Sequence, residues 1–163
     1  SVNIVRSKGN INLIEVTNSS SDALDVDFSN ITINNIKVTS ALNDCVDFSS
    51  GVYNLGKLNL KNCGDKALSA GEKSTIELNE IFVDGANIGL ASKDSSIVNL
   101  MNARLKNLKI CLSAYKKKQE YNGGFIFADS IKCENYNKKV DIDKNSKIFL
   151  KKELLKNNES DNS

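Results

Sequence analysis

The chain has 163 residues, which suits a single domain large enough to bury a hydrophobic core. Its 22 basic and 20 acidic residues leave a net charge of +2, so the overall charge does not indicate nucleic acid or a membrane surface as a partner. No apolar run approaches the ~20 residues of a membrane span, and the absence of histidine excludes a Ser–His or Cys–His mechanism within this chain.

The first 16 residues, SVNIVRSKGNINLIEV, already show strand-like alternation, and no amphipathic capping segment stands before them. An uncapped first turn of a repeat structure exposes apolar surface and a strand edge. We therefore expect this turn to meet either the remainder of a longer chain or a neighbouring copy.

From residue 23 onward, small and apolar residues recur at a nearly constant spacing. Two adjacent columns repeat every 22 residues, one of small and one of aliphatic residues: Ala23, Cys45, Ala67, Gly89 and Cys111, then Leu24, Val46, Leu68, Leu90 and Leu112. A further column has spacings of 22, 23, 22 and 28 residues: Ile31, Tyr53, Ile76, Val98 and Ile126. The extra residues fall near 71–75 and 115–124, which indicates loops at these two places.

Within each repeat the apolar residues alternate, as in ITINNIKV and IELNEIFV, and this period of two is typical of strands. The 22-residue repeat with several short strands predicts an all-β fold, a right-handed parallel β-helix of about six to seven turns over residues 1–150. We expect tight turns where residue types that tolerate a left-handed backbone recur: Asn18, Ser40, Asn62, Gly85, Asn107 and Asn135.

The C-terminal segment, residues 151–163, is expected to be a polar tail or a short capping helix. Only SKIFLKKELLKNN could form a helix, and the last residues are strongly polar.

The four cysteines are predicted to be reduced and mostly buried. Cys45 and Cys111 share a column three turns apart, roughly 14 Å at ~4.8 Å per rung, whereas a disulfide needs Cα atoms within about 7 Å. Cys63 and Cys133 stand in different columns, also about three turns apart. The same separation argues against a metal bound by these thiols.

Four aspartates are expected to form two stacked pairs on neighbouring rungs: Asp22, Asp25, Asp44 and Asp47. Like charges about 4.8 Å apart repel unless a raised pKa or a cation compensates. Hard oxygen donors at this density suit Ca²⁺. The alternatives are a solvated acidic face and catalytic carboxylates.

Acidic and basic residues follow this group on the next turns: Asp65, Lys66, Glu72, Lys73, Lys93 and Asp94. Such a group could bind a uronic acid through Ca²⁺ and remove its C5 proton, with Lys66 or Lys73 as the base. The other interpretation is a cross-rung ladder of salt bridges on an exposed face.

The second insertion, within AYKKKQEYNGG, places aromatic and basic residues on one loop, with Tyr115 and Lys117 as candidate contacts to an anionic glycan. Basic residues outside this loop lack interleaved aromatics, so we expect no nucleic-acid partner.

The stretches SDALDVDFSN, NDCVDFSSG, GDKALSAGEKS and NIGLASKDSS resemble repeats of the pectate-lyase-like superfamily of right-handed parallel β-helix proteins, which are bacterial surface and polysaccharide-related proteins. The resemblance implies the β-helix fold over about residues 11–150. Lyases of this architecture pair Ca²⁺ held by acids with a Lys or Arg base, and the epimerases carry an Asp-Pro-His motif. This chain has neither Pro nor His, so no catalytic residue is carried over.

We predict a binding or scaffold module of a bacterial surface or secreted protein, located outside the cell or at its surface, that contacts polysaccharide along the solenoid face. One alternative is a Ca²⁺-dependent polysaccharide lyase, and another is a structural unit that stacks end to end. The absence of histidine, the unmatched lyase motif and the small size favour binding or structure over catalysis.

Overall fold

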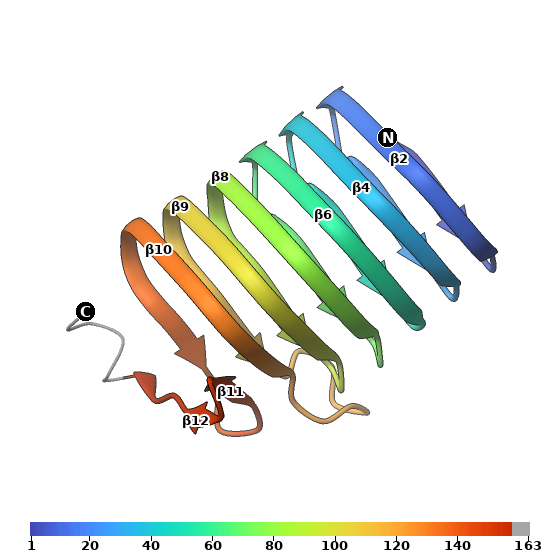
Figure 1. The fold of residues 1–163 in the computed structure, drawn as a ribbon. Helices are drawn as coiled ribbons and strands as arrows, with labels where there is room; N and C mark the ends of the chain where they lie inside the picture. The colour runs from blue at the N-terminus through green and yellow to red at the C-terminus, as the bar shows by residue number, and fades with distance from the viewer. Residues whose placement is uncertain (158–163) are drawn as a thin grey trace.

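The computed structural model describes residues 1–157, and this part of the chain contains twelve β-strands. Their bounds are β1 Val2–Val5, β2 Lys8–Ser19, β3 Leu24–Asp27, β4 Asn30–Ala41, β5 Val46–Ser49, β6 Val52–Cys63, β7 Lys66–Gly71, β8 Thr75–Lys93, β9 Ile97–Tyr115, β10 Phe125–Ile142, β11 Lys147–Leu150 and β12 Glu153–Leu154. The strands stack as coils of a parallel β-solenoid of about seven turns (Figure 1). The all-β solenoid predicted from the repeat is confirmed.

Each of the first coils contributes a short strand and a long strand, and both pair in parallel with the next coil. The short strands follow the order β1, β3, β5 and β7, and the long strands the order β2, β4 and β6. The two series meet in β8, whose first part pairs with β6 and whose second part pairs with β7. From β8 to β10, one continuous strand therefore makes most of a coil.

The apolar columns of the sequence are the columns of the core. Leu24 is in register with Val46, and Val46 with Leu68, and all three are fully buried. The in-register stacking places similar side chains directly above one another, which fills a narrow core along the whole axis. The residues inserted near 115–124 form a loop, and β9 and β10 remain paired on both sides of it.

The predicted tight turns all have the expected backbone. Positive φ angles occur at the six corner positions, which are Asn18 (55°), Ser40 (68°), Asn62 (54°), Gly85 (93°), Asn107 (61°) and Asn135 (52°). The Asn135 side-chain amide also donates a hydrogen bond to the Asn107 side-chain oxygen on the neighbouring coil at 2.6 Å. Asn18, Ser40 and Asn62 lie one residue before the ends of β2, β4 and β6, whereas the other three corners lie within the continuous strands β8, β9 and β10.

The cysteines do not follow the prediction, because they form two disulfides. Cys45 bonds to Cys63 with a Cα–Cα distance of 5.3 Å, and Cys111 bonds to Cys133 with a Cα–Cα distance of 6.4 Å. The prediction compared only cysteines about three turns apart, Cys45 with Cys111 in one column and Cys63 with Cys133 in different columns. It overlooked adjacent coils: Cys63 is in register with Ala41, which directly follows the corner at Ser40 and precedes Cys45 by four residues.

The C-terminal end of the described chain is closed by a hairpin. β12 pairs antiparallel with β11, with Phe149 opposite Leu154 and Leu150 opposite Glu153. A turn at Lys151 and Lys152 and the strand Glu153–Leu154 therefore begin the segment for which a polar tail or a short helix was expected, and residues 158–163 of that segment lie outside the described residues. Within residues 1–157, no helix is long and apolar enough to cross a membrane.

Candidate functional site

The short strands carry three of the residues that the sequence singled out, namely Asp25, Asp47 and Lys66. Alternate side chains of a strand point to opposite sides, so that Leu24 and Val46 fill the core while Asp25 and Asp47 lie on the outer side. Asp25 is in register with Asp47, and Asp47 with Ser69. This face therefore begins with carboxylates and continues with a small hydroxyl side chain.

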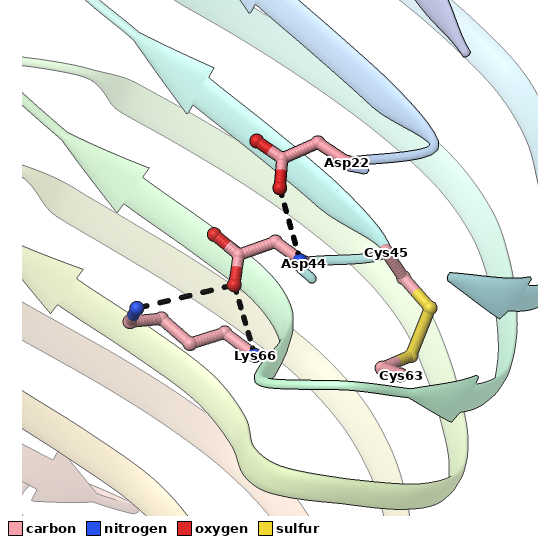
Figure 2. The surroundings of a disulfide bond; sticks show 5 residues. All are labelled: Asp22, Asp44, Cys45, Cys63 and Lys66. Carbon is pink, nitrogen blue, oxygen red and sulfur yellow. Dashed lines mark hydrogen bonds and ion pairs between the residues drawn. A yellow bond between two sulfur atoms is a disulfide. The ribbon is translucent and has the colours of Figure 1, made fainter. Parts of the chain in front are cut away.

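Beside these strands, three residues form a ladder along the solenoid axis (Figure 2). Asp22 accepts a hydrogen bond from the Asp44 backbone N–H at 3.0 Å, and Asp44 accepts one from the Lys66 backbone N–H at 2.9 Å. The Lys66 Nζ lies 3.9 Å from Asp44 Oδ1 and 2.9 Å from Asp65 Oδ2. The backbone of each coil thus holds the carboxylate of the preceding coil in place.

Three carboxylates converge at this ladder. One oxygen each of Asp22, Asp44 and Asp47 lies within 4.8 Å of the other two, and Asp25 is not part of this group. Carboxylate oxygens suit Ca²⁺, but three of these side chains supply only part of the about six to eight oxygens that Ca²⁺ takes. The group fits a cation only where water or a bound ligand completes the set.

Burial and neighbouring charges shift the pKa values on this face. Burial, and after it the charge of Asp44, raises the pKa of Asp47 from 3.8 to about 6. Burial also raises the pKa of Asp44, while the Lys66 backbone N–H acts in the opposite direction. The pKa of Lys93 is lowered by burial first and then by the charge of Lys66. An acid with a raised pKa beside a lysine with a lowered pKa is a frequent property of functional sites.

Lys93 extends toward these aspartates from two coils away because Gly71 leaves space for its side chain. A Cβ atom on Gly71 would lie 3.0 Å from Lys93 Cε and 3.5 Å from its Cγ. The charges that act on Lys93 include those of Lys66, Asp47 and Lys117. We call the following five residues the acid–lysine cluster: Asp22, Asp44, Asp47, Lys66 and Lys93.

Two further residues complete the surroundings of the cluster. Burial raises the pKa of Tyr115, on which the charges of Lys66 and Asp65 also act. Ser69 is fully buried, and its Oγ has no hydrogen-bond partner within the described chain. Sequence reasoning missed Ser69 and Gly71, although their positions one repeat from Asp47 and Lys93 were the signal that could have found them.

Two further predicted site residues, Asp94 and Glu72, contact the insertion loop. Asp94 is buried and accepts hydrogen bonds from the backbone N–H groups of Lys117 and Lys118 at 2.7 and 2.9 Å. Glu72 forms an ion pair with Lys118. Lys73 is exposed, and its side chain forms no hydrogen bond or ion pair among residues 1–157. Asp94 and Glu72 therefore anchor the loop, and Lys73 stands apart from the acid–lysine cluster.

No known protein family, no curated protein and no solved structure matches this chain. The repeat pattern and the structure together establish that the fold is a parallel β-solenoid.

The pKa of Asp47 predicts a pH dependence of stability. Because the folded chain keeps a proton on Asp47 up to a pKa of about 6, whereas the unfolded chain releases it near 3.8, stability should fall as the pH rises from about 4 to about 6. Asp47→Asn should reduce this fall and increase the free energy of unfolding near neutral pH by about 1–3 kcal/mol.

Urea unfolding at several pH values measures the effect, with Asp129→Asn at an exposed position as the control. Equal pH dependence in both variants and the unaltered protein would contradict the assignment to Asp47.

Proposed function

We propose that this chain is a β-solenoid binding module of a secreted or surface protein, and that it holds an acidic polysaccharide against the acid–lysine cluster. The observation that carries the proposal is the position of the half-buried Lys93, whose pKa the charges of Lys66 and Lys117 lower while Asp47 and Asp44 act in the opposite direction. A bound carboxylate would stabilise the charged form of Lys93, because an opposite charge nearby favours ionisation.

The rigid scaffold supports the same proposal. Every coil of this sheet is hydrogen-bonded to the next, so the charged side chains are mounted on a backbone that has little freedom to lose on binding. A linear polysaccharide could follow the stacked coils along the axis. The two disulfides support a location in an oxidising compartment, where such bonds persist.

Replacing the central lysine tests the proposal. Lys93→Met keeps an unbranched apolar side chain but removes the charge, and we expect it to weaken the binding of a homogeneous oligogalacturonate by about tenfold. Titration calorimetry at constant salt measures the dissociation constant.

Lys73→Met is the matched control, because it removes one positive charge from an exposed side chain that forms no ion pair with any other residue of the described part, 1–157. Equal weakening in both variants would show that only the overall charge matters. An absence of saturable binding to the unaltered protein would refute the proposal.

A Ca²⁺-dependent polysaccharide lyase is the second candidate function. It is favoured by the three converging carboxylates and by the lowered pKa of Lys93, which eases formation of the neutral amine that a base requires. Lys66 and Lys93 are both at the cluster, whereas Lys73 is not. Unsaturated products from polygalacturonate that appear only with Ca²⁺, and that Lys66→Ala or Lys93→Met abolishes, would establish this function in place of simple binding.

A further inference from the structure

A groove on the outside of the long strands lies apart from the acid–lysine cluster. Its central section has a volume of about 320 Å³ and is lined on three adjacent strands by Lys57, Asn59, Glu80, Phe82, Asn102 and Arg104. These strands are β6, β8 and β9, which stand side by side in the long-strand sheet (Figure 1). We call this feature the corner groove, because its central section lies three to five residues before the corner residues Asn62, Gly85 and Asn107.

The corner groove continues along the solenoid axis in both directions. Toward the N-terminus it shares Lys57 and Asn59 with a section of about 300 Å³ that extends to Asn12 on β2. Toward the C-terminus it shares Phe82 and Arg104 with a smaller section that extends to β10. The groove therefore crosses six adjacent strands, about 24 Å at ~4.8 Å per strand, and suits an extended chain.

The charges of the groove favour an anion. Five basic and two acidic residues line its three sections. Three of the basic residues are paired, namely Lys37 with Glu15, Lys106 with Asp84 and Lys132 with Glu134.

The two remaining basic residues, Lys57 and Arg104, form no ion pair or hydrogen bond within residues 1–157. They stand two strands apart on opposite sides of the central section. This separation, about 9.6 Å along the axis at ~4.8 Å per strand, is close to the length of a disaccharide.

Glu80 stands on β8, between the strands of these two cations, and a neutral acceptor, Asn59, lies on the same strand as Lys57. The Asn59 side-chain oxygen is buried and has no hydrogen-bond partner in the described chain. A buried acceptor without a partner is unfavourable, and a donor from a ligand or water would satisfy it. Hydroxyl groups are such donors. The central section thus combines cations for carboxylates with an unused acceptor for hydroxyls.

We propose that the corner groove is a second binding site, and that its ligand is a chain of uronic acids. A peptide fits less well, because the strands beneath the groove use their backbone groups in pairing with one another and leave only side chains to recognise the ligand. The inference shares its ligand class with the proposed function, but it concerns the long strands β6, β8 and β9 and different residues.

Removing the two unpaired charges tests the site. We expect Lys57→Gln/Arg104→Gln to weaken the binding of a homogeneous oligogalacturonate to the groove by about tenfold. Lys61→Gln/Lys109→Gln removes the same charge from exposed lysines outside the groove and should weaken binding by less than about twofold. Both double variants alter exposed side chains, and circular dichroism checks that each keeps its fold.

The same titration in Lys93→Met separates this inference from the proposed function. Binding that survives Lys93→Met and is lost on adding Lys57→Gln/Arg104→Gln places a ligand in the groove independently of the cluster. Equal losses of oligogalacturonate affinity in Lys57→Gln/Arg104→Gln and in its charge-matched control would show that the corner groove is not a binding site. Tighter binding of polyglutamate than of oligogalacturonate, or unchanged binding of a carboxyl-reduced oligosaccharide, would overturn the uronic-acid ligand.

Discussion

Phe48→Ala is expected to lower the free energy of unfolding by about 3–5 kcal/mol. The Phe48 ring is fully buried and packs against the Tyr53 ring with centroids 4.7 Å apart. Its strand is paired on both sides, with β3 and with β7, so the surrounding backbone has little freedom to close the cavity. Urea unfolding followed by circular dichroism measures the change.

Phe28→Ala is the matched control for this cavity. The Phe28 side chain is 56% exposed and lies against Arg6, whose guanidinium carbon is 5.3 Å from the ring centroid. We expect a loss of less than about 1 kcal/mol, since only an exposed cation–π contact and little apolar burial disappear. Similar losses of unfolding free energy for the two variants would mean that burial of the Phe48 ring adds little to the stability of the core.

Gly124→Ala is expected to cost at least about 3 kcal/mol, because a new methyl group would meet backbone that has no room to move. A Cβ atom at Gly124 would lie 1.8 Å from the Ser92 carbonyl oxygen on the neighbouring coil. Gly124 also donates its N–H to the Ser146 side chain at 3.0 Å on the coil that follows. Relief of the clash would therefore disturb pairing on both sides, and thermal unfolding should show a clear loss.

Gly71→Ala provides the comparison, since its Cβ would meet the end of a flexible side chain. The nearest atom is Lys93 Cε at 3.0 Å. We expect a stability loss of less than about 1 kcal/mol, together with weaker oligogalacturonate binding because the Lys93 side chain is displaced. If Gly71→Ala destabilised the fold as strongly as Gly124→Ala, this would contradict the claim that only the flexible Lys93 side chain lies over Gly71.

The repeat made the fold predictable in unusual detail. The columns that contain Leu24, Val46 and Leu68 are in register, and the corner residues Asn18 and Ser40 have the left-handed backbone expected of them. In a parallel solenoid, a residue lies directly against the residue one period away. A linear spacing in the sequence therefore becomes a contact without any further information.

Other contacts cross the corners of a coil or span two coils, and these were not predictable. Cys63 approaches Cys45 because a corner brings residues on adjacent coils together, not because they share a column. Lys93 approaches Asp47 because Gly71 leaves the intervening surface free. Neither distance follows from a spacing of 22.

The candidate sites show the same division. Stacking of Asp22, Asp44 and Lys66 could be read from the repeat, and hydrogen bonds between coils now connect them. The corner groove could not, because its volume depends on how the side chains of β6, β8 and β9 pack beside one another.

The sequence by itself determined the β-solenoid, its register, its turns and the position of its second insertion. It could do so because residues one period apart stack directly on neighbouring coils, and every repeat of the sequence shows the same spacing. Only the tertiary structure decided the disulfides, the shifted pKa values of the acid–lysine cluster and the shape of the groove. These depend on distances across corners and on burial by neighbouring coils, which the order of residues along one coil does not contain.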